Sequence, residues 1–293
     1  SGYTLTQDRA THLTAAVTTT TSTIASPLIL SLGSTDNVGK GVIEIDEELL
    51  FVDNFDRVGN TATVSPFGRG YLGTTAATHT SESKVTISPT FPRFSIKRAI
   101  NDTIKGLSGT LFAADTTTIT YSSAVSTYRL PTTGTSLNIR NILSVAYESV
   151  GPSKEWIPIR SWRFDANANS GSFTSEQSIS IYDMVTSGRT IQIVFSKDPT
   201  PFSTNADVFT TQTGLPESCR DLVILGSTYR LLSNLDPARA AMVSPQADEV
   251  DSKRPYGSSQ SLTRNIYALY TQRLAEEVKS QQNKHPIRVH YSL

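Results

Sequence analysis

The sequence predicts an α+β protein in which a small helical bundle carries two β-rich insertions, the second of them sandwich- or barrel-like. An apolar stripe with helical spacing runs through residues 91–107, and comparable helical patterns occur only at 215–235 and 261–282. The regions between them are rich in Thr and Ser interleaved with Val, Ile, Tyr and Phe, which is typical of strands with one solvated face. Because a helical stripe needs partner helices, we expect these three segments to pair.

Composition limits the possible classes of protein. The 293 residues carry no net charge, which argues against nucleic acid as the main partner, because phosphate binding needs a basic surface. No apolar run approaches the roughly 18 residues that span a bilayer, and the first ten residues lack the features of a signal peptide. We therefore expect a soluble protein without a membrane partner, made in a reducing cytoplasm. The lone Cys219 indicates a buried structural thiol rather than a nucleophile.

Residues 1–23 are expected to form an N-terminal helix and a linker. Thr4 and Gln7 have the spacing of a capping box, which places the helix at 5–17. The β-branched run 18–23 would end it, since such residues favour extended backbone.

Residues 24–90 are expected to form a small β module. This module holds the main acidic cluster, Asp46, Glu47, Glu48 and Asp53. A calcium loop needs alternating oxygen ligands around a central Gly, which is missing, so the cluster is interpreted as a solvated hairpin tip.

The stretch Gly68–Gly73 matches GxGxxG by letter. It does not lie between a strand and a helix with an acidic residue about twenty positions later, so dinucleotide binding is rejected. A tight β loop whose glycines allow positive φ is the better interpretation.

Residues 91–109 form the expected hub helix, which begins near Pro92. Its stripe predicts a core that is completed by the later helices of residues 211–285. In the helix at 215–235, Gly226 would let a second helix approach closely, and the helix at 261–282 stops before Pro286. The predicted hub core consists of Ile96, Ile100, Ile104, Leu222 and Leu269.

The second β region covers residues 110–210. Short strand-like runs at spacings near ten residues predict a sandwich or a barrel. Trp156 and Trp162 would form either part of its core, which is favoured, or a sugar-stacking patch.

The last segment, residues 286–293, alternates Ile287, Val289 and Tyr291 with Arg288, His290 and Ser292. Such a strand either folds back on its own sheet or adds to the edge of another chain, and the sequence does not favour one over the other.

No constellation in the sequence supports an enzyme, a metal site or a cofactor. The four histidines are scattered without ligand spacing. There is no GxSxG, P-loop or HExxH motif.

Three stretches resemble virion proteins of tailed phages. VSPFGRGYLGTTAATH at 64–79 is similar to the RGxxGTxAAxH block of β modules in phage head and tail proteins. FPRFSIKRAINDTIKGL at 91–107 and LPESCRDLVILGSTYRLLSN at 215–234 resemble helices of siphophage head-to-tail adaptors, also called connectors. Most adaptors of this kind are shorter, and residues 110–210 have no counterpart in them.

The resemblance implies a structural virion protein of the neck. Such a protein forms a ring of twelve copies between the portal protein and the next neck or tail protein. It would dock on the portal through its C-terminal helix and tail, with Ile287, Arg288, Val289, His290, Tyr291 and Leu293 as the interface. Lys97, Arg98, Lys105 and Arg273 would face DNA in the channel, although a solvated helix face is the stronger interpretation.

A tail-fibre or baseplate module that recognises cell-surface carbohydrate is the alternative. It would use Trp156 or Trp162 and would predict trimers or hexamers.

Overall fold

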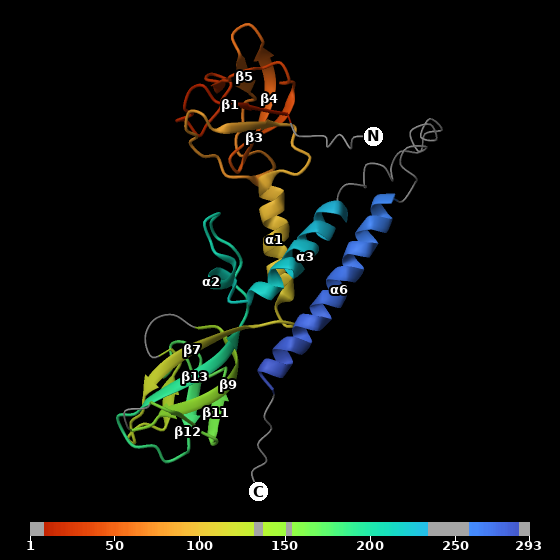
Figure 1. Cartoon of the computed structure of the whole chain (residues 1–293). Helices are drawn as coiled ribbons and strands as arrows, with labels where there is room; N and C mark the ends of the chain where they lie inside the picture. Colours follow the sequence, from red (N-terminus) through yellow and green to blue (C-terminus); the bar gives the residue numbers. More distant parts are fainter. Residues whose placement is uncertain (1–8, 132–136, 151–153, 234–257, 287–293) are drawn as a thin grey trace. The chain divides into compact units, whose positions relative to one another are not determined.

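The structure is a computed structural model that describes residues 9–131, 137–150, 154–233 and 258–286 (Figure 1). Over these residues the protein is mostly β, with three sheets and four α-helices. The predicted helical bundle carrying two β-rich insertions is therefore wrong. Two of the three apolar cores belong to β-sheets, and only one lies among helices. The chain divides into two compact units, Ser1–Ala99 and Ile100–Leu293, and helix α1 (Arg93–Leu107) spans the division between them.

The first unit contains one six-stranded antiparallel sheet with the order β1-β6-β3-β4-β5-β2. Its strands are β1 (Arg9–His12), β2 (Ile29–Ser31), β3 (Gly41–Ile45), β4 (Glu48–Asp56), β5 (Thr61–Val64) and β6 (Lys84–Ile87). The two edge strands meet through a bridge between Leu13 and Leu32. Thr14 N donates to Ser31 O at 2.9 Å beside this bridge. The sheet thus curves until it closes at this end, which leaves few unpaired edge groups.

The N-terminal helix predicted at 5–17 is wrong over its described part, because Arg9–His12 is strand β1. Thr11 pairs with Val85 of β6, and Leu13 and Val17 both lie buried in the core of the curved sheet. Their spacing of four residues imitates a helical stripe. In fact the chain turns between them, and Val17 forms its own bridge to His79.

The β part of the second unit consists of two antiparallel sheets around a shared core. One has the order β10-β9-β13-β7 and the other β11-β12-β8. The strands are β7 (Ala113–Thr120), β8 (Thr127–Arg129), β9 (Ile139–Glu148), β10 (Trp156–Pro158), β11 (Trp162–Asp165), β12 (Ser178–Ile181) and β13 (Thr190–Lys197). The central strand β13 places Ile191, Ile193 and Phe195 in the core at alternate positions, as expected for a strand with one buried face.

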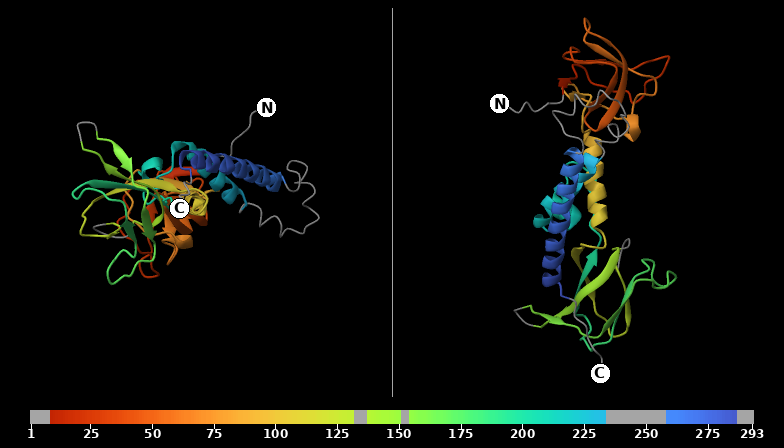
Figure 2. Two further views of the ribbon diagram at one scale, coloured as in Figure 1. Left: turned by 90° about the horizontal axis from the view of Figure 1, so that it is seen from below. Right: turned by 90° about the vertical axis from the view of Figure 1, so that its right-hand side faces the viewer.

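The second unit also contains most of the helical residues. Helix α2 is Phe209–Thr213, the 3-10 turn η2 is Glu217–Cys219, α3 is Arg220–Ser233 and α6 is Ser258–Lys284. Figures 1 and 2 show α3 and α6 side by side. They run antiparallel, because Tyr229 near the end of α3 lies 5.3 Å from Tyr267 early in α6, measured between ring centroids, whereas Asp221 at the start of α3 binds Arg273.

Gly226 explains how closely α1, α3 and α6 pack. A Cβ atom added there would lie 2.4 Å from Thr103 Cγ2 of α1 and 3.0 Å from the Tyr270 ring of α6. The predicted role of Gly226 in close helix approach is thereby confirmed. Among the residues that the structure describes, no helix combines the length and the apolar character needed to cross a membrane.

Candidate functional site

The turn between β3 and β4 places the carboxylate of Glu48 in the interior of the first unit. Ile45 pairs with Glu48, so only Asp46 and Glu47 form the connection, and Asp46 adopts a φ of 55°. Glu48 is the first residue of β4, and its side chain is only 1% exposed. The interpretation of the acidic cluster as a solvated hairpin tip is therefore wrong for Glu48, although Asp46 is exposed.

Arg69 binds Glu48 through two parallel hydrogen bonds. Arg69 Nε donates to Glu48 Oε1 at 2.6 Å, and Arg69 Nη2 donates to Glu48 Oε2 at 2.8 Å. The Arg69 side chain is itself only 3% exposed, and it also donates to the carbonyl oxygens of Thr19 and Ala77. This is the planar geometry in which guanidinium and carboxylate interact most strongly.

His79 links the same carboxylate to the turn. Its Nε2 lies 2.9 Å from Glu48 Oε2, and its Nδ1 lies 2.8 Å from Asp46 Oδ2. The His79 side chain is 1% exposed. A doubly protonated imidazole donates to both carboxylates, so the cluster pairs two cations, Arg69 and His79, with two anions, Glu48 and Asp46.

The glycine-rich loop wraps around Glu48. Backbone N–H groups of Gly70 and Ala77 each donate to Glu48 at 3.0 Å. Gly70 and Gly73 have φ values of 60° and 84°, which confirms the prediction of a tight β loop with glycines at positive φ. Thr74 accepts a hydrogen bond from the N–H of Leu49 at 3.1 Å. The block similar to RGxxGTxAAxH therefore surrounds one buried carboxylate.

Electrostatics explain why the Glu48 carboxylate stays charged inside the protein. Burial alone would raise its pKa, but the hydrogen bonds from Arg69 and His79 overcome this effect and hold the pKa of Glu48 at about 2. Burial likewise opposes the charge on His79, yet the two carboxylates raise its pKa above the usual 6.5. Both oxygens of Glu48 and both ring nitrogens of His79 are engaged in these contacts. The cluster therefore fixes the loop to the turn.

Sequence reasoning missed this cluster because its members are separated by 21 to 33 positions. The signal that could have found it is the pair Arg69 and His79 within a β module, where polar side chains flanking glycines need buried partners.

The predicted hub residues have different environments. Ile104 and Leu222 are fully buried in the helical core, and Ile100 packs against it. Ile96 is half-buried and precedes the division between the units. Leu269 is 54% exposed, so its placement in the core is wrong. It lies outside the sector of α6 that faces α3, which is marked by Tyr270 and Glu277.

Lys97 and Arg273, which were predicted to face DNA in a channel, form ion pairs within the protein. Lys97 Nζ lies 3.2 Å from Glu47. Arg273 binds Asp221, Glu276 and Glu277, each at 2.8 or 2.9 Å. Arg98 and Lys105 lie on exposed parts of α1, one in each unit. These ion pairs reduce the positive charge that the four residues offer to DNA.

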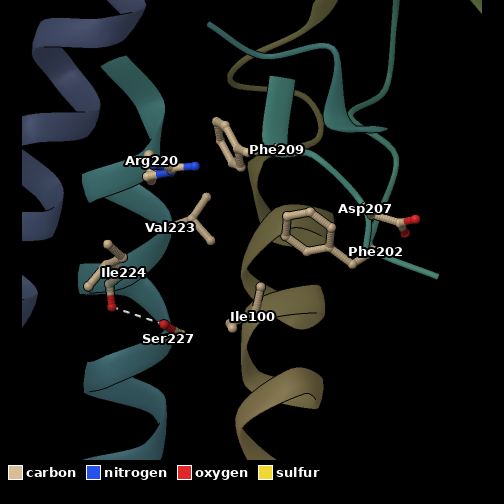
Figure 3. Close-up of a pocket in the computed structure, with 8 residues that line it drawn as sticks. All are labelled: Ile100, Phe202, Asp207, Phe209, Arg220, Val223, Ile224 and Ser227. Atoms are coloured by element: carbon tan, nitrogen blue, oxygen red, sulfur yellow. Dashed lines mark hydrogen bonds between the residues drawn. The ribbon is translucent and has the colours of Figure 1, made fainter. Parts of the chain in front are cut away.

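The helices of the second unit carry exposed apolar side chains and one cavity. Leu262 and Leu269, which are 50% and 54% exposed, are two helical turns apart on α6 and therefore share one face. Ile224 of α3 is also exposed. A cavity of about 250 Å³ lies beside Ile224, with Ile100, Phe202, Phe209 and Val223 as its apolar wall (Figure 3). Figure 3 shows Arg220 and Asp207 at this site too, which gives it one charge of each sign.

The remaining candidate groups from the sequence are the possible metal ligands, Cys219 and the two tryptophans. Within the described ranges, no group of His, Cys, Asp and Glu could hold a metal ion. Cys219 is buried, and burial together with Glu277 raises the pKa of its thiol to about 12, so it is a poor nucleophile. Trp162 packs against the β core, whereas Trp156 on the edge strand β10 is 42% exposed. The two indoles therefore differ in their access to a ligand.

The proposed docking residues Ile287, Arg288, Val289, His290, Tyr291 and Leu293 lie outside the described residues. No known protein family and no curated protein matches the chain.

Proposed function

We propose that the protein is a structural component of a tailed-phage virion, a head-to-tail adaptor made in the host cytoplasm and assembled into the neck. In this role it forms a ring of twelve copies between the portal protein and the next neck or tail protein. The observation that carries the proposal is the exposed apolar face of α6, which bears Leu262 and Leu269. The similarity of residues 64–79, 91–107 and 215–234 to phage virion proteins supports it.

The exposed leucines favour a binding role. Helix α6 is 27 residues long, and α3 covers only the face that contains Tyr270 and Glu277. Apolar surface left in water is unfavourable, and side chains that group on one face of a helix mark a protein contact. We propose that this face meets the portal or a neighbouring copy.

The ion pairs of the protein also support an assembly role. The Glu48 cluster and the Arg273 ion pairs use their charges to hold segments of the chain together. An assembly protein needs such rigidity, because a ring places identical surfaces in register only if each copy has the same shape. DNA in the channel would then make passive contact with exposed cations such as Arg98 and Lys105.

The proposal assigns portal docking to α6 and residues 287–293. Deleting Ile287–Leu293 is expected to abolish co-purification with portal while the thermal melting of the protein stays unchanged. If the truncated protein still joins portal normally, the role of this segment is wrong.

The apolar face is tested with the double variant Leu262→Gln/Leu269→Gln. Each leucine is half-buried already, so a contact would add about 1 kcal/mol per side chain, and we expect about a thirtyfold loss of affinity for portal or for another copy. Met184→Gln is the matched control, because Met184 is fully exposed in the β part of the same unit. Equal affinity of the double variant and the control would contradict the proposal.

A second candidate function is favoured by Trp156 and by the β-rich fold. An exposed indole on a sheet edge can stack on a sugar ring. A tail-fibre or baseplate module that binds host cell-surface carbohydrate would use it. This candidate predicts trimers or hexamers, and it predicts that Trp156→Ala abolishes retention on a glycan array while Trp162→Phe does not.

A further inference from the structure

Strand β7 is an outer strand of the four-stranded sheet, on the side of β13 away from β9 (Figure 1). Just beyond β7, Tyr121 donates its N–H to Arg189 O at 2.8 Å and accepts from the N–H of Gly188 at 2.7 Å, both in the residues that precede β13. Backbone groups point alternately to the two sides of an antiparallel strand. The odd-numbered residues of β7 therefore bond to β13, and the backbone groups of the even-numbered residues face outward, at Ala114, Thr116, Thr118 and Thr120.

Both ends of this outward edge are occupied by side chains. At the start, Gln281 Oε1 accepts a hydrogen bond from Phe112 N at 3.2 Å, and Gln281 Nε2 donates to Phe112 O at 2.6 Å. At the other end, the Tyr128 hydroxyl accepts from Ser122 N at 2.8 Å and donates to Ser122 O at 2.9 Å. In each place one side chain satisfies both backbone groups of an even-numbered residue, as a neighbouring strand would.

The backbone between these two ends is open. Within the described residues, the outward N–H groups of Ala114, Thr118 and Thr120 have no hydrogen-bond partner in the protein. Thr116 N donates to the neighbouring Asp115 Oδ1 at 2.7 Å. The side chains at the four even-numbered positions are exposed. A row of unpaired backbone groups on an exposed strand is a template for another strand.

Other sheet edges in the described part of the chain are protected. The sheet of the first unit closes through Leu13 and Leu32. The edge strand β10 has three residues and contains Pro158, which cannot donate a hydrogen bond. Strands β8 and β11 have three and four residues. Strand β7 has eight residues, and its outward positions hold only Ala and Thr, without a proline or a charge.

We propose that β7 is a dimer interface, in which it pairs antiparallel with β7 of a second copy about a two-fold axis. An edge without a protecting charge or proline pairs with an identical edge, because each copy carries both the donors and the acceptors that the other needs. The pairing joins two four-stranded sheets into one continuous sheet, which ends on both sides in the short, proline-containing β10. A two-fold contact uses the same surface on both copies, so it closes and leaves no β7 edge for further copies.

The occupied ends of the edge select one register. Phe112 and Ser122 lie at equal distances in sequence from Thr117, so the open stretch is symmetric about Thr117, and the two-fold axis passes there. If the axis moved by one residue in either direction, Phe112 or Ser122 would lie opposite an open residue of the second copy. Because the backbone groups of Phe112 and Ser122 are already bonded, those open groups would stay unpaired.

The facing side chains are compatible in this register. Thr116 faces Thr118 of the second copy, and Thr–Thr pairs are favourable across strands. Asp115, the one charged residue of β7, faces Ile119 of the second copy and not the other Asp115. Its carboxylate is also paired with Lys197 of its own chain at 2.6 Å. No like charges of the two β7 strands therefore meet.

The inference does not rest on the proposed adaptor function. Copies in a ring are related by one repeated rotation, so neighbouring copies meet through different surfaces and not through a two-fold axis. The dimer is therefore a form of the free protein, and it separates before the copies enter a ring. Sedimentation of the isolated protein tests the dimer, whereas the copy number in the particle tests the adaptor function, so either can fail alone.

Cysteine cross-linking tests the position of the axis. Thr117→Cys brings the two thiols together at the axis, where the facing Cα atoms lie about 4.5 Å apart because odd-numbered residues do not bond across it, and a disulfide spans this distance. Thr120→Cys is the control, since the axis places its two thiols at opposite ends of the interface. The native Cys219 is buried. After mild oxidation of the full chain, we expect a disulfide-linked dimer of Thr117→Cys and none of Thr120→Cys. Equal cross-linking of both variants, or of neither, would overturn the proposal.

Paired charge variants test the same register without a cross-link. Thr116→Lys/Thr118→Lys places like charges opposite each other in both cross-strand pairs, whereas Thr116→Lys/Thr118→Glu places opposite charges there. Both positions are exposed, so the two variants differ only in the sign of one surface charge. Because like charges repel across strands and opposite charges attract, the dimer dissociation constant of the first variant should be at least about tenfold higher.

Analytical ultracentrifugation over a range of protein concentrations measures these constants and that of the unchanged protein. We expect the unchanged protein to pass from monomer to dimer as its concentration rises. If it sediments as a monomer at every concentration, or if the two charge variants have equal constants, the β7 dimer is refuted.

Discussion

Replacing the buried Glu48 by Gln should destabilise the first unit more than replacing an exposed carboxylate of the same unit does. Gln has the same shape but no charge, and its amide group replaces one acceptor oxygen by a donor. Arg69, 3% exposed, and His79, 1% exposed, would lose their shared counter-ion inside the protein. The N–H groups of Gly70 or Ala77 would lose an acceptor as well.

The magnitude follows from this burial. Removing one partner of a buried, hydrogen-bonded charge pair costs about 3–5 kcal/mol of unfolding free energy, because the remaining charge is left without compensation. For a unit of about 100 residues, a loss of 3 kcal/mol lowers the melting temperature by at least about 12 °C. Glu47→Gln is the matched control one position earlier. Glu47 pairs with Lys97 in a partly exposed ion pair, so its loss should cost no more than about 1 kcal/mol.

The assay can separate the two units of the full chain. Trp156 and Trp162 both belong to the second unit, so tryptophan fluorescence reports on that unit alone. Hydrogen exchange of the amides in β4 and β6 reports on the first unit. Glu48→Gln should accelerate exchange in β4 and β6 and leave the fluorescence melting curve in place. If Glu48→Gln and Glu47→Gln had equal effects, or if only the fluorescence curve moved, the conclusion that the cluster holds the glycine-rich loop against the β3–β4 turn would be refuted.

Three further predictions follow from the same contacts. The stability of the first unit should be greatest between about pH 4.5 and 6.5. The contribution of Glu48, whose pKa is about 2, is complete above pH 4.5 and is lost as the pH falls, whereas the contribution of His79, whose pKa is raised, is complete below pH 6.5 and is lost as the pH rises. In urea titrations His79→Gln should remove the loss of stability at alkaline pH, and persistence of that loss would exclude His79 as its cause. Gly226→Ala should cost about 1–3 kcal/mol of unfolding free energy in the second unit, because its Cβ would overlap Thr103, whereas Gly39→Ala, where a Cβ meets nothing within 4 Å, should be neutral in the same denaturation experiment. Cys219 should react with a thiol reagent only after unfolding, since burial and Glu277 raise its pKa to about 12; rapid labelling of the native protein would contradict this.

The helices were predictable because their apolar residues repeat locally. Helix α1 and the later helices were located from stripes such as Ile100 and Ile104, and Gly226 was recognised as a contact point from its place in such a stripe. An apolar stripe does not show how much of the helix circumference is buried. Leu269 belongs to an apolar row on α6, yet only the sector opposite α3 is buried, and the sequence does not state which sector that is.

The fold class could not be predicted because sheet pairing is not local. Strand β1 pairs with β6 across more than seventy residues, and the spacing of Leu13 and Val17 imitates a helix when this pairing is unknown. The Glu48 cluster could not be predicted for the same reason, since Glu48 and Arg69 meet only after β4 and the glycine-rich loop have folded together. Treating the helices as the organising core underestimated the strands, which supply two of the three apolar cores.

Counting the subunits in the assembled particle tests the proposed function most directly. Cryo-electron microscopy of the neck, or native mass spectrometry of the isolated complex, gives the number of copies without disturbing the protein. The adaptor function predicts a ring of twelve copies bound to portal. Three or six copies located at a fibre or baseplate would contradict it and would favour the carbohydrate-binding alternative.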